Sequence, residues 1–247
     1  MATAAYLIAR KVKLMAIVDT IWTVGLGISA LVYHAVANLE SIRSWVVLLI
    51  ICLWSFRLSY HLFRDRIFTG QEDPRYKALA KYWALKSARN FYFLFLAQII
   101  FIALFLCPVI IAMQNPQPIW AWTDTLGILI AISAMVGEWV ADHQLATFRA
   151  KPDNKRSVCK DGLWRYSRHP NYFFEWLHWF AYFSFAVGSS SVWFALVGPI
   201  AIFIFLRFLT GVPYAEMSSL KSRGDAYRQY QSSTNAFFPW IKRNKTA

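Results

Sequence analysis

The sequence predicts an all-α integral membrane protein, a bundle of about six transmembrane helices that forms a single domain over residues 1–247. Composition is the first observation: 57% of the residues are hydrophobic and 16% are charged, whereas soluble domains have roughly 45–50% and about 25%. The 12 Trp, 20 Phe and 12 Tyr residues must be buried in protein or lipid, which excludes a disordered chain. The other two observations are the lengths of the apolar stretches and the positions of the basic residues.

Six apolar stretches follow one another along the chain. They are Leu14–Ala37, Ser44–Phe63, Phe91–Met113, Ile119–Val140, Tyr172–Gly188 and Val192–Val212. Because about 20 helical residues, with a range of about 17–25, cross a hydrocarbon core of roughly 30 Å, each stretch is long enough for one span. The first stretch exceeds the apolar region of a signal peptide and no small-residue cleavage site follows it, so we expect it to be retained.

The basic residues are spread unevenly over the connections between these stretches. Of 26 Lys and Arg residues, three precede the first stretch, eight lie in 57–89, seven in 149–168 and seven from 207 onward, which leaves Arg43. The positive-inside rule then predicts that both termini and both long loops are cytoplasmic, which requires an even number of spans. The net charge of +13 therefore indicates contact with anionic membrane lipids and no nucleic-acid partner.

Ionisable residues occur inside the predicted spans, where they are costly and often mark a site. They are Asp19, Glu138, Asp142, Glu175 and His178. Glu138 and Asp142 are four residues apart and share a helix face. The alternative is that each lies near the membrane interface and is satisfied by water or a neighbouring Arg.

Residues 141–179 form the most informative predicted cytoplasmic segment. It contains seven cations, Arg149, Lys151, Lys155, Arg156, Lys160, Arg165 and Arg168, interleaved with Phe148, Trp164, Tyr166 and Tyr172. Arg side chains bind phosphate oxygens in pairs and aromatic rings can stack on flat rings, so the mixture suits a dinucleotide. A basic loop lying on lipid head groups explains the charge well, but it explains the compact Arg168-His-Pro-Asn-Tyr172 cluster poorly.

Motifs of soluble cofactor and metal sites are absent from the sequence. It contains neither Gly-x-Gly-x-x-Gly nor a P-loop pattern, so we expect no Rossmann or P-loop nucleotide site. The five histidines lack the spacing with cysteines or carboxylates that would predict a metal site. Cys52, Cys107 and Cys159 form no disulfide framework.

Several motifs in the C-terminal half resemble those of a known family. They are Asp142-His-Gln-Leu with Arg149, Gly162-Leu-Trp-Arg-Tyr-Ser-Arg-His-Pro-Asn-Tyr172, Glu175 with Trp179, and Tyr227-Arg-Gln-Tyr230 followed by Phe238-Pro-Trp240. Over residues 135–240 the chain resembles steroid 5α-reductases and their bacterial membrane relatives, which use NADPH to reduce a carbon–carbon double bond conjugated to a carbonyl. The resemblance implies a C-terminal cofactor-binding region, a lipid-soluble substrate (a steroid, isoprenoid or fatty enone) and a location in a bacterial inner membrane.

A second family shares part of this pattern. Arg168-His-Pro-Asn-Tyr172, Glu216 and the tyrosine pair of the tail also resemble isoprenylcysteine carboxyl methyltransferases and phospholipid methyltransferases, which bind S-adenosylmethionine. The Ala-Asp-x-Gln-Leu-x-x-Phe-Arg stretch that ends at Arg149 favours the reductase. A non-enzymatic membrane scaffold is the third reading, and it leaves the motifs unexplained.

The reductase resemblance implies a set of cofactor contacts. It comprises Asp142, Arg149, Asn171, Tyr172 and Glu175, with Arg165, Tyr166, Arg168, His169, Glu216 and Tyr230 close by. Carboxylates suit ribose hydroxyls or the nicotinamide amide, and Arg149 suits the pyrophosphate. Two departures from the family occur: Phe174 stands where the family has Gly, and the early-helix Gln-Glu pair of steroid reductases is not visible.

The chemistry of enone reduction suggests further residues. Hydride delivery to the β-carbon leaves negative charge on the carbonyl oxygen, so a positioned donor must stabilise it and then supply a proton. At the expected membrane level the candidates are Asp19, Tyr60 and His61, with Tyr92 as a further one. The alternatives are that Tyr60 and His61 anchor the interface and that Asp19 pairs with a cytoplasmic Arg. We expect Glu72-Asp-Pro-Arg-Tyr76 to be structural.

Overall fold

A computed structural model describes residues 2–154 and 157–241. The structure is 79% helical and has no strand within those ranges, which confirms the predicted all-α membrane bundle. Among these described residues, five helical segments are long and apolar enough to cross a membrane: Ile17–Val36, Ile42–Leu62, Pro74–Met113, Trp122–Ala150 and Val192–Arg223. The chain divides into two compact units, one of Met1–Ala121 with Phe185–Val197 and one of Trp122–Ser184 with Gly198–Ala247.

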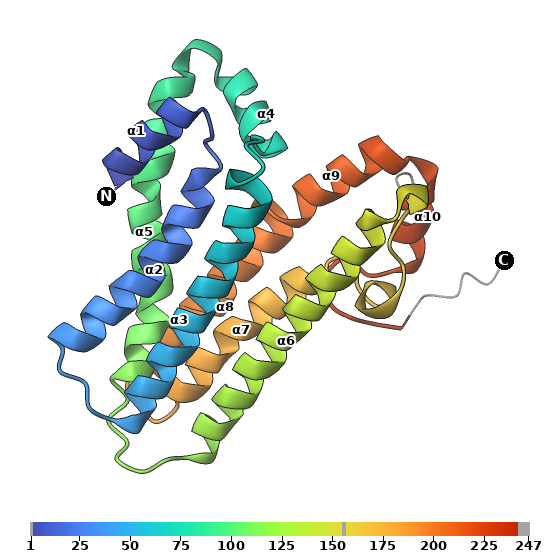
Figure 1. Ribbon diagram of the computed structural model, residues 1–247. Helices are drawn as coiled ribbons and strands as arrows, with labels where there is room; N and C mark the ends of the chain where they lie inside the picture. The colour runs from blue at the N-terminus through green and yellow to red at the C-terminus, as the bar shows by residue number, and fades with distance from the viewer. Residues whose placement is uncertain (1, 155–156, 242–247) are drawn as a thin grey trace. The chain divides into compact units, whose positions relative to one another are not determined.

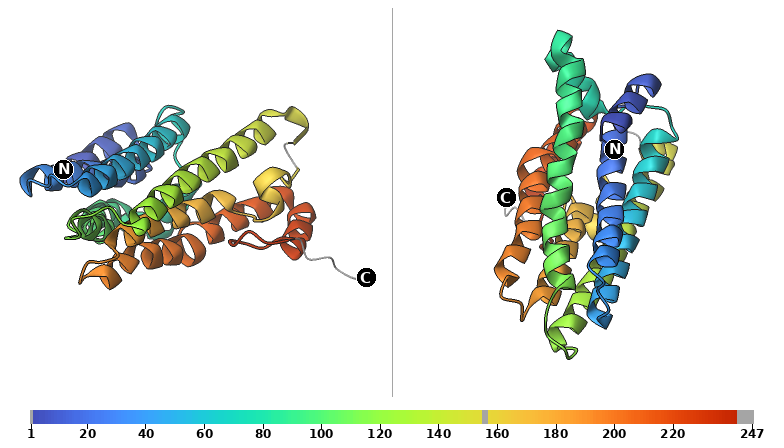
Figure 2. Two further views of the ribbon diagram at one scale, coloured as in Figure 1. Left: turned by 90° about the horizontal axis from the view of Figure 1, so that it is seen from below. Right: turned by 90° about the vertical axis from the view of Figure 1, so that its left-hand side faces the viewer.

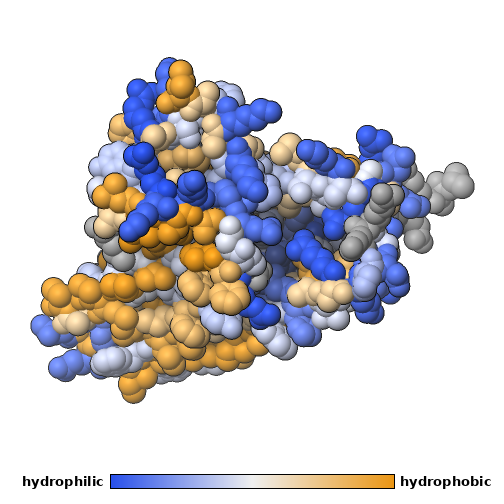
Figure 3. Space-filling model, turned by 45° about the horizontal axis from the view of Figure 1, so that its top comes forward, coloured by the Kyte–Doolittle hydropathy of each residue, from blue (hydrophilic) through white to orange (hydrophobic). Residues whose placement is uncertain are grey.

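The first unit is built around three long helices. Its elements are α1 (Ala2–Val12), α2 (Ile17–Val36), α3 (Ile42–Leu62), the π-helical turn η1 (Phe63–Ile67), α4 (Pro74–Trp83), the 3-10 turn η2 (Ala84–Lys86), α5 (Ser87–Met113) and the 3-10 turn η5 (Val192–Leu196). Helices α2, α3 and α5 run side by side (Figure 1, Figure 2). Apolar side chains cover much of the face shown in Figure 3, as expected for helices that contact lipid.

Small residues let α2 and α3 approach closely. A Cβ at Gly27 would overlap the side chain of Ser55, so a larger residue would separate the two helices. Polar bonds cross the same contact, because the Ser55 hydroxyl donates to the carbonyl of Thr23 at 2.8 Å and the Thr23 and Ser59 hydroxyl oxygens lie 2.8 Å apart. Small residues and interhelical hydrogen bonds are what drive helix packing in lipid.

At the end of the first unit formed by residues 41–43 and 115–119, the Arg43 side chain is buried. It is 4% exposed and donates to the carbonyls of Gln117 at 2.6 Å and Ile119 at 3.0 Å. The Asn115 amide donates to the carbonyls of Phe185 and Val187, each at 2.8 Å. The single basic residue outside the predicted cytoplasmic segments therefore holds a turn.

The second unit contains the remaining helices. They are α6 (Trp122–Ala150), the 3-10 turns η3 (Pro152–Asn154) and η4 (Gly162–Arg165), α7 (Pro170–Ala186) up to Ser184, α8 (Val197–Ile204) from Gly198, the π-helical turn η6 (Phe205–Leu209), α9 (Val212–Arg223) and α10 (Asp225–Ser233). The stretch predicted over Tyr172–Gly188 forms the 17-residue α7, at the lower end of the length that spans a bilayer.

Two predicted boundaries differ from the structure. Helix α6 continues ten residues past Val140 to Ala150, so Asp142 and Arg149 lie on a helix and not in a loop. The reason is that 141–150 has no Gly or Pro, and Pro152 is the first residue that interrupts the helical pattern. The last stretch, Val192–Val212, is divided into η5, α8 and η6 before Pro213 begins the first turn of α9.

Candidate functional site

The candidate site in the second unit begins where α6 and α7 pack together. A Cβ on Gly137 would overlap the ring of Phe174. The glycine on α6 therefore makes room for the Phe174 ring of α7. This close approach brings the C-terminal half of α6 beside the start of α7.

Asp142 of α6 and Asn171 of α7 are joined by a hydrogen bond. The Asn171 Nδ2 atom donates to Asp142 Oδ1 at 3.1 Å. The Asn171 Oδ1 atom is buried and has no hydrogen-bond partner in the described structure. Asp142 thus fixes the orientation of the side-chain amide, whose oxygen is left as a buried acceptor open to a ligand's donor.

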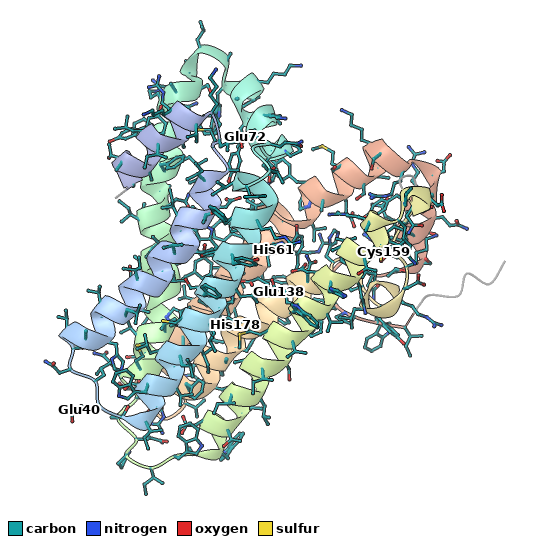
Figure 4. The ribbon with its side chains drawn as sticks, viewed as in Figure 1. Glu40, His61, Glu72, Glu138, Cys159 and His178 are labelled. Atoms are coloured by element: carbon teal, nitrogen blue, oxygen red, sulfur yellow. The ribbon has the colours of Figure 1, made fainter. Side chains whose placement is uncertain are left out.

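Two aromatic rings and two buried carboxylates lie on α6, on α7 or just before α7. The rings of His169 and Tyr172 are stacked, with centroids 5.3 Å apart and planes 7° from parallel. Glu138 and Glu175 are each 7% exposed, and the Trp179 indole N–H donates to Glu175 Oε1 at 3.4 Å. Figure 4 labels Glu138 on α6 and His178 on α7.

The segment after α6 folds back onto that helix. Gly162 has a φ of +57°, a left-handed conformation that suits glycine, and the Gln144 side chain lies over it. The Gln144 Oε1 atom accepts from the Leu163 N–H at 3.0 Å, and the Trp164 indole N–H donates to the carbonyl of Ala141 at 3.0 Å. Gln144, which the motif contains but which was not predicted as a site residue, therefore positions the turn that carries Arg165 and Tyr166.

The predicted cations of this segment have different surroundings. Arg149, in the last turn of α6, Lys151 and Arg165 are exposed, and Tyr166 is 44% exposed. Lys155 and Arg156 lie outside the described residues. Arg149 thus lies about two turns beyond Asp142 on α6, and a ligand can reach its side chain.

Arg168 is held inside a polar network by the C-terminal segment. Its Nε donates to Glu216 Oε1 at 2.7 Å, its Nη2 pairs with the same oxygen, and its Nη1 donates to the carbonyls of Gln231 at 3.0 Å and Thr234. Glu216 Oε2 accepts from the Gln231 amide at 2.9 Å. Since every guanidinium nitrogen has a protein partner, these contacts favour a structural role for Arg168 and Glu216; their predicted contact with a cofactor stays a prediction.

Tyr230 and Trp240 of the C-terminal segment form hydrogen bonds with the residues that precede Arg168. The Tyr230 hydroxyl donates to the carbonyl of Trp164 and lies 3.2 Å from that of Ser167. The Trp240 N–H donates to the carbonyl of Tyr166 at 3.0 Å. Burial raises the pKa of Tyr230, and it raises the pKa of Tyr227 to about 12, so both phenols remain protonated hydrogen-bond donors.

His169 contacts Glu216 of the Arg168 network on one side and the ring of Tyr172 on the other. Burial lowers the pKa of its imidazole, and Glu216, whose Oε1 is 3.5 Å from Nε2, acts in the opposite direction. The larger effect is burial, so the neutral ring is favoured. A neutral ring stacked on Tyr172 is a polar wall of the site and carries no fixed charge.

Comparison with known protein families identifies the family of the chain. A family model described as "Protein of unknown function (DUF1295)" matches residues 5–234. The chain belongs to this family. It is the steroid 5α-reductase-like family, so the resemblance drawn from the C-terminal motifs is confirmed at family level.

One curated relative is similar over most of the chain. The uncharacterized protein C594.04c of Schizosaccharomyces pombe (strain 972 / ATCC 24843) is 28% identical over 254 residues, which cover 90% of this chain and 72% of the relative. No solved structure matches the chain. Family membership and the structure together support a helical membrane protein of the DUF1295 family.

The predicted catalytic residues of this family member lie in the first unit. Asp19 Oδ2 accepts from Arg75 Nη2 at 2.8 Å and Asp19 Oδ1 accepts from the Tyr76 hydroxyl at 2.6 Å. Arg75 is also bound by Asp73, from Nε at 3.1 Å and from Nη2 at 3.0 Å. Both oxygens of Asp19 are occupied, which favours the structural alternative; its catalytic role stays a prediction.

Tyr60 and His61 end α3. Tyr60 is 58% exposed and its ring is stacked on Phe56, with centroids 6.4 Å apart. His61 is partly buried and is labelled in Figure 4. An exposed tyrosine at a helix end fits interfacial anchoring; the role of Tyr60 and His61 as proton donors stays a prediction.

Proposed function

We propose that the protein is a membrane-embedded, NADPH-dependent reductase of a carbon–carbon double bond in a lipid-soluble substrate. The observation that carries the proposal is the Asp142–Asn171 pair with its unsatisfied, buried amide oxygen. A buried acceptor without a partner costs about 1–3 kcal/mol. A donor from a bound ligand, such as a carboxamide N–H or a ribose hydroxyl, would remove that cost.

The residues around this pair fit a dinucleotide. Asp142 holds the Asn171 amide in one orientation. The buried carboxylate of Glu175 is steadied by Trp179 and suits hydroxyl groups, while the exposed Arg149 supplies a guanidinium for phosphate oxygens. The stacked His169 and Tyr172 rings offer a flat wall for an aromatic ring.

The roles of these side chains follow from their chemistry. When bound, NADPH would supply a hydride for the double bond. Phe174 and Trp179 are large side chains beside the polar groups and would keep water away. The proton that completes the reduction requires a donor, for which the sequence suggests Tyr60 and His61.

Cofactor titration tests the proposal. Calorimetry of the detergent-solubilised protein should show NADPH binding, and Arg149→Ala should weaken it about 10- to 150-fold, because a charge-assisted contact contributes about 1.5–3 kcal/mol. Asn171→Ala should weaken it about 3- to 10-fold, as expected for a neutral hydrogen bond. Lys221→Ala is the matched control, since it removes an exposed cation of α9 outside the site.

The same titration with S-adenosylmethionine decides between the two families. Binding of S-adenosylmethionine with the same dependence on Arg149 and Asn171, and no binding of NADPH, would contradict the reductase and favour a lipid methyltransferase. Unchanged affinity for both cofactors in both variants would remove the α6–α7 site from the proposal.

A further inference from the structure

The first unit contains a cavity of about 520 Å³ that none of the predicted site residues explains. It is bounded by α1, the turn after α1, α4 and the start of α5. Three cations line it, Arg10, Lys13 and Lys77, together with one carboxylate, Glu72, which Figure 4 labels close to α1 and α4.

The carboxylate of Glu72 is engaged by backbone groups. It accepts from the N–H groups of Met15, of Ala16 at 3.0 Å and of Asp73 at 3.0 Å, and so caps the start of α2. Negative charge at a helix N-terminus is stabilising. The three cations outnumber this carboxylate, so the cavity attracts an anion.

The floor of the cavity is apolar. Tyr6, Tyr76 and Phe91 line it and belong to a buried cluster with Ala9 and Phe95. The Tyr6 hydroxyl donates to the carbonyl of Ala88 at 2.6 Å, which ties α1 to α5. An occupant of this cavity therefore needs an apolar part as well as a negative charge.

Exposed apolar side chains occur beside the cavity on the same elements. Ile8 of α1 is 56% exposed, Tyr82 of α4 is 84% exposed, and Leu85, which itself lines the cavity, is fully exposed. Such side chains are stable in lipid, and a tyrosine among them is typical of the membrane interface. The cations therefore lie at head-group depth next to acyl-chain surfaces.

Lys13 has a backbone conformation in which glycine is the usual residue. Its φ is +60°, and bonds from its N–H to the carbonyl of Arg10 and from the Leu14 N–H to the carbonyl of Ala9 close the end of α1. This is the Schellman arrangement, whose left-handed position usually carries Gly. A lysine here is disfavoured by local geometry, which indicates that its charge has a use.

We propose that this cavity binds the phosphate head group of an anionic membrane phospholipid, with Arg10, Lys13 and Lys77 around the phosphate. The acyl chains follow the exposed apolar side chains of α1 and of the α4–α5 junction. The site is distinct from the Asp142–Asn171 cluster and does not depend on the proposed reductase activity.

Lipid retention measured by native mass spectrometry tests the site. The full chain in neutral detergent is titrated with phosphatidylglycerol or with phosphatidylcholine, and it should retain phosphatidylglycerol preferentially. Lys13→Gly should weaken this retention about five- to tenfold, while the thermal unfolding midpoint stays the same or rises, because Gly suits the left-handed position. If Lys13 were merely structural, Lys13→Gly would leave the retention of phosphatidylglycerol unchanged.

A charge-matched pair on α4 serves as the control. Lys77→Gln should weaken phosphatidylglycerol retention to a similar extent, whereas Lys81→Gln, one turn further along and outside the cavity lining, should not. An equal loss of phosphatidylglycerol retention in Lys77→Gln and Lys81→Gln would mean that the lipid is attracted by the general surface charge, and it would overturn the site. Retention of phosphatidylcholine equal to that of phosphatidylglycerol would overturn it as well. Displacement of phosphatidylglycerol by an equal concentration of inorganic phosphate would overturn the lipid assignment. NADPH affinity, measured in parallel, should be unchanged in the Lys13 and Lys77 variants.

Discussion

Polar groups are arranged differently around Asp19 in the first unit and around Asn171 in the second. Both oxygens of Asp19 accept strong hydrogen bonds, and its partner Arg75 is shared with Asp73. The Asn171 amide nitrogen donates to Asp142, whereas its buried oxygen has no hydrogen-bond partner in the part of the chain that the structure describes. A network whose groups are all satisfied by the protein stabilises the fold, whereas an oriented, unsatisfied group indicates a place for a ligand.

Arg168 belongs with Asp19 in this comparison, although its motif suggested cofactor binding. It is bound by Glu216 and two backbone carbonyls, and its side chain is 10% exposed. Membership of a motif therefore does not separate ligand contacts from the residues that shape the site. Three predictions test this difference between structural groups and ligand-binding groups, from the largest expected effect to the smallest.

Arg168→Ala should have the largest effect, on stability. Removing one partner of a buried ion pair leaves the other uncompensated and costs about 3–5 kcal/mol, here with the loss of two bonds to tail carbonyls. Denaturant unfolding of the solubilised protein measures the change. Arg168→Lys should cost less, because it keeps the charge but not the fork of donors. Normal stability with weakened NADPH binding in Arg168→Lys would make Arg168 a cofactor contact.

Asp19→Ala should have an intermediate effect, about 1–3 kcal/mol, because it removes two bonds to a partly exposed carboxylate. Stability and turnover should fall together, and Asp19→Asn should be milder since it keeps an acceptor. Thermal stability is measured alongside single-turnover oxidation of NADPH. A well-folded Asp19→Ala protein with turnover reduced about 10²–10³-fold would instead identify Asp19 as the group that stabilises the developing charge.

Acidification should have the smallest effect, through His169. Burial lowers the pKa of this side chain in the folded protein, and the charged groups beside it are Glu216, Arg168 and Arg207. As pH falls below about 6.5, the unfolded chain takes up a proton before the folded protein does, so stability decreases by at most about 1.4 kcal/mol per pH unit. His169→Gln should remove this part of the pH dependence; an unchanged profile would contradict the prediction.

The sequence predicted the fold well because apolar length and composition are local properties. The first four predicted stretches match α2, α3, α5 and α6 within a few residues, apart from the polar extension of α6 to Ala150. That extension is amphipathic and has no apolar run, so hydropathy did not indicate it. The residue pair Asp142 and Asn171 was predicted from motifs, and the structure brings the two side chains together.

The partners of charged residues were not predictable in the same way. Asp19 and Arg75 are 56 residues apart, and Arg168 and Glu216 are 48 apart, so their pairing depends on tertiary packing. The sequence could only suggest that some Arg pairs with Asp19. Likewise, the role of Gln144 became clear only when Gly162 was found beneath its side chain.

The contact between Gly137 and Phe174 also constrains how this site can change during evolution. Any side chain at 137 would collide with the phenyl ring, whereas shortening 174 alone would leave a hole beside the Asn171 amide. Each substitution is harmful by itself, yet the two could be tolerated together if 174 becomes small first and 137 then gains a side chain. The two positions are therefore epistatic. A change from Phe to Gly at 174 reshapes the wall of the site without loss only if a side chain at 137 fills the space that the Phe174 ring occupied.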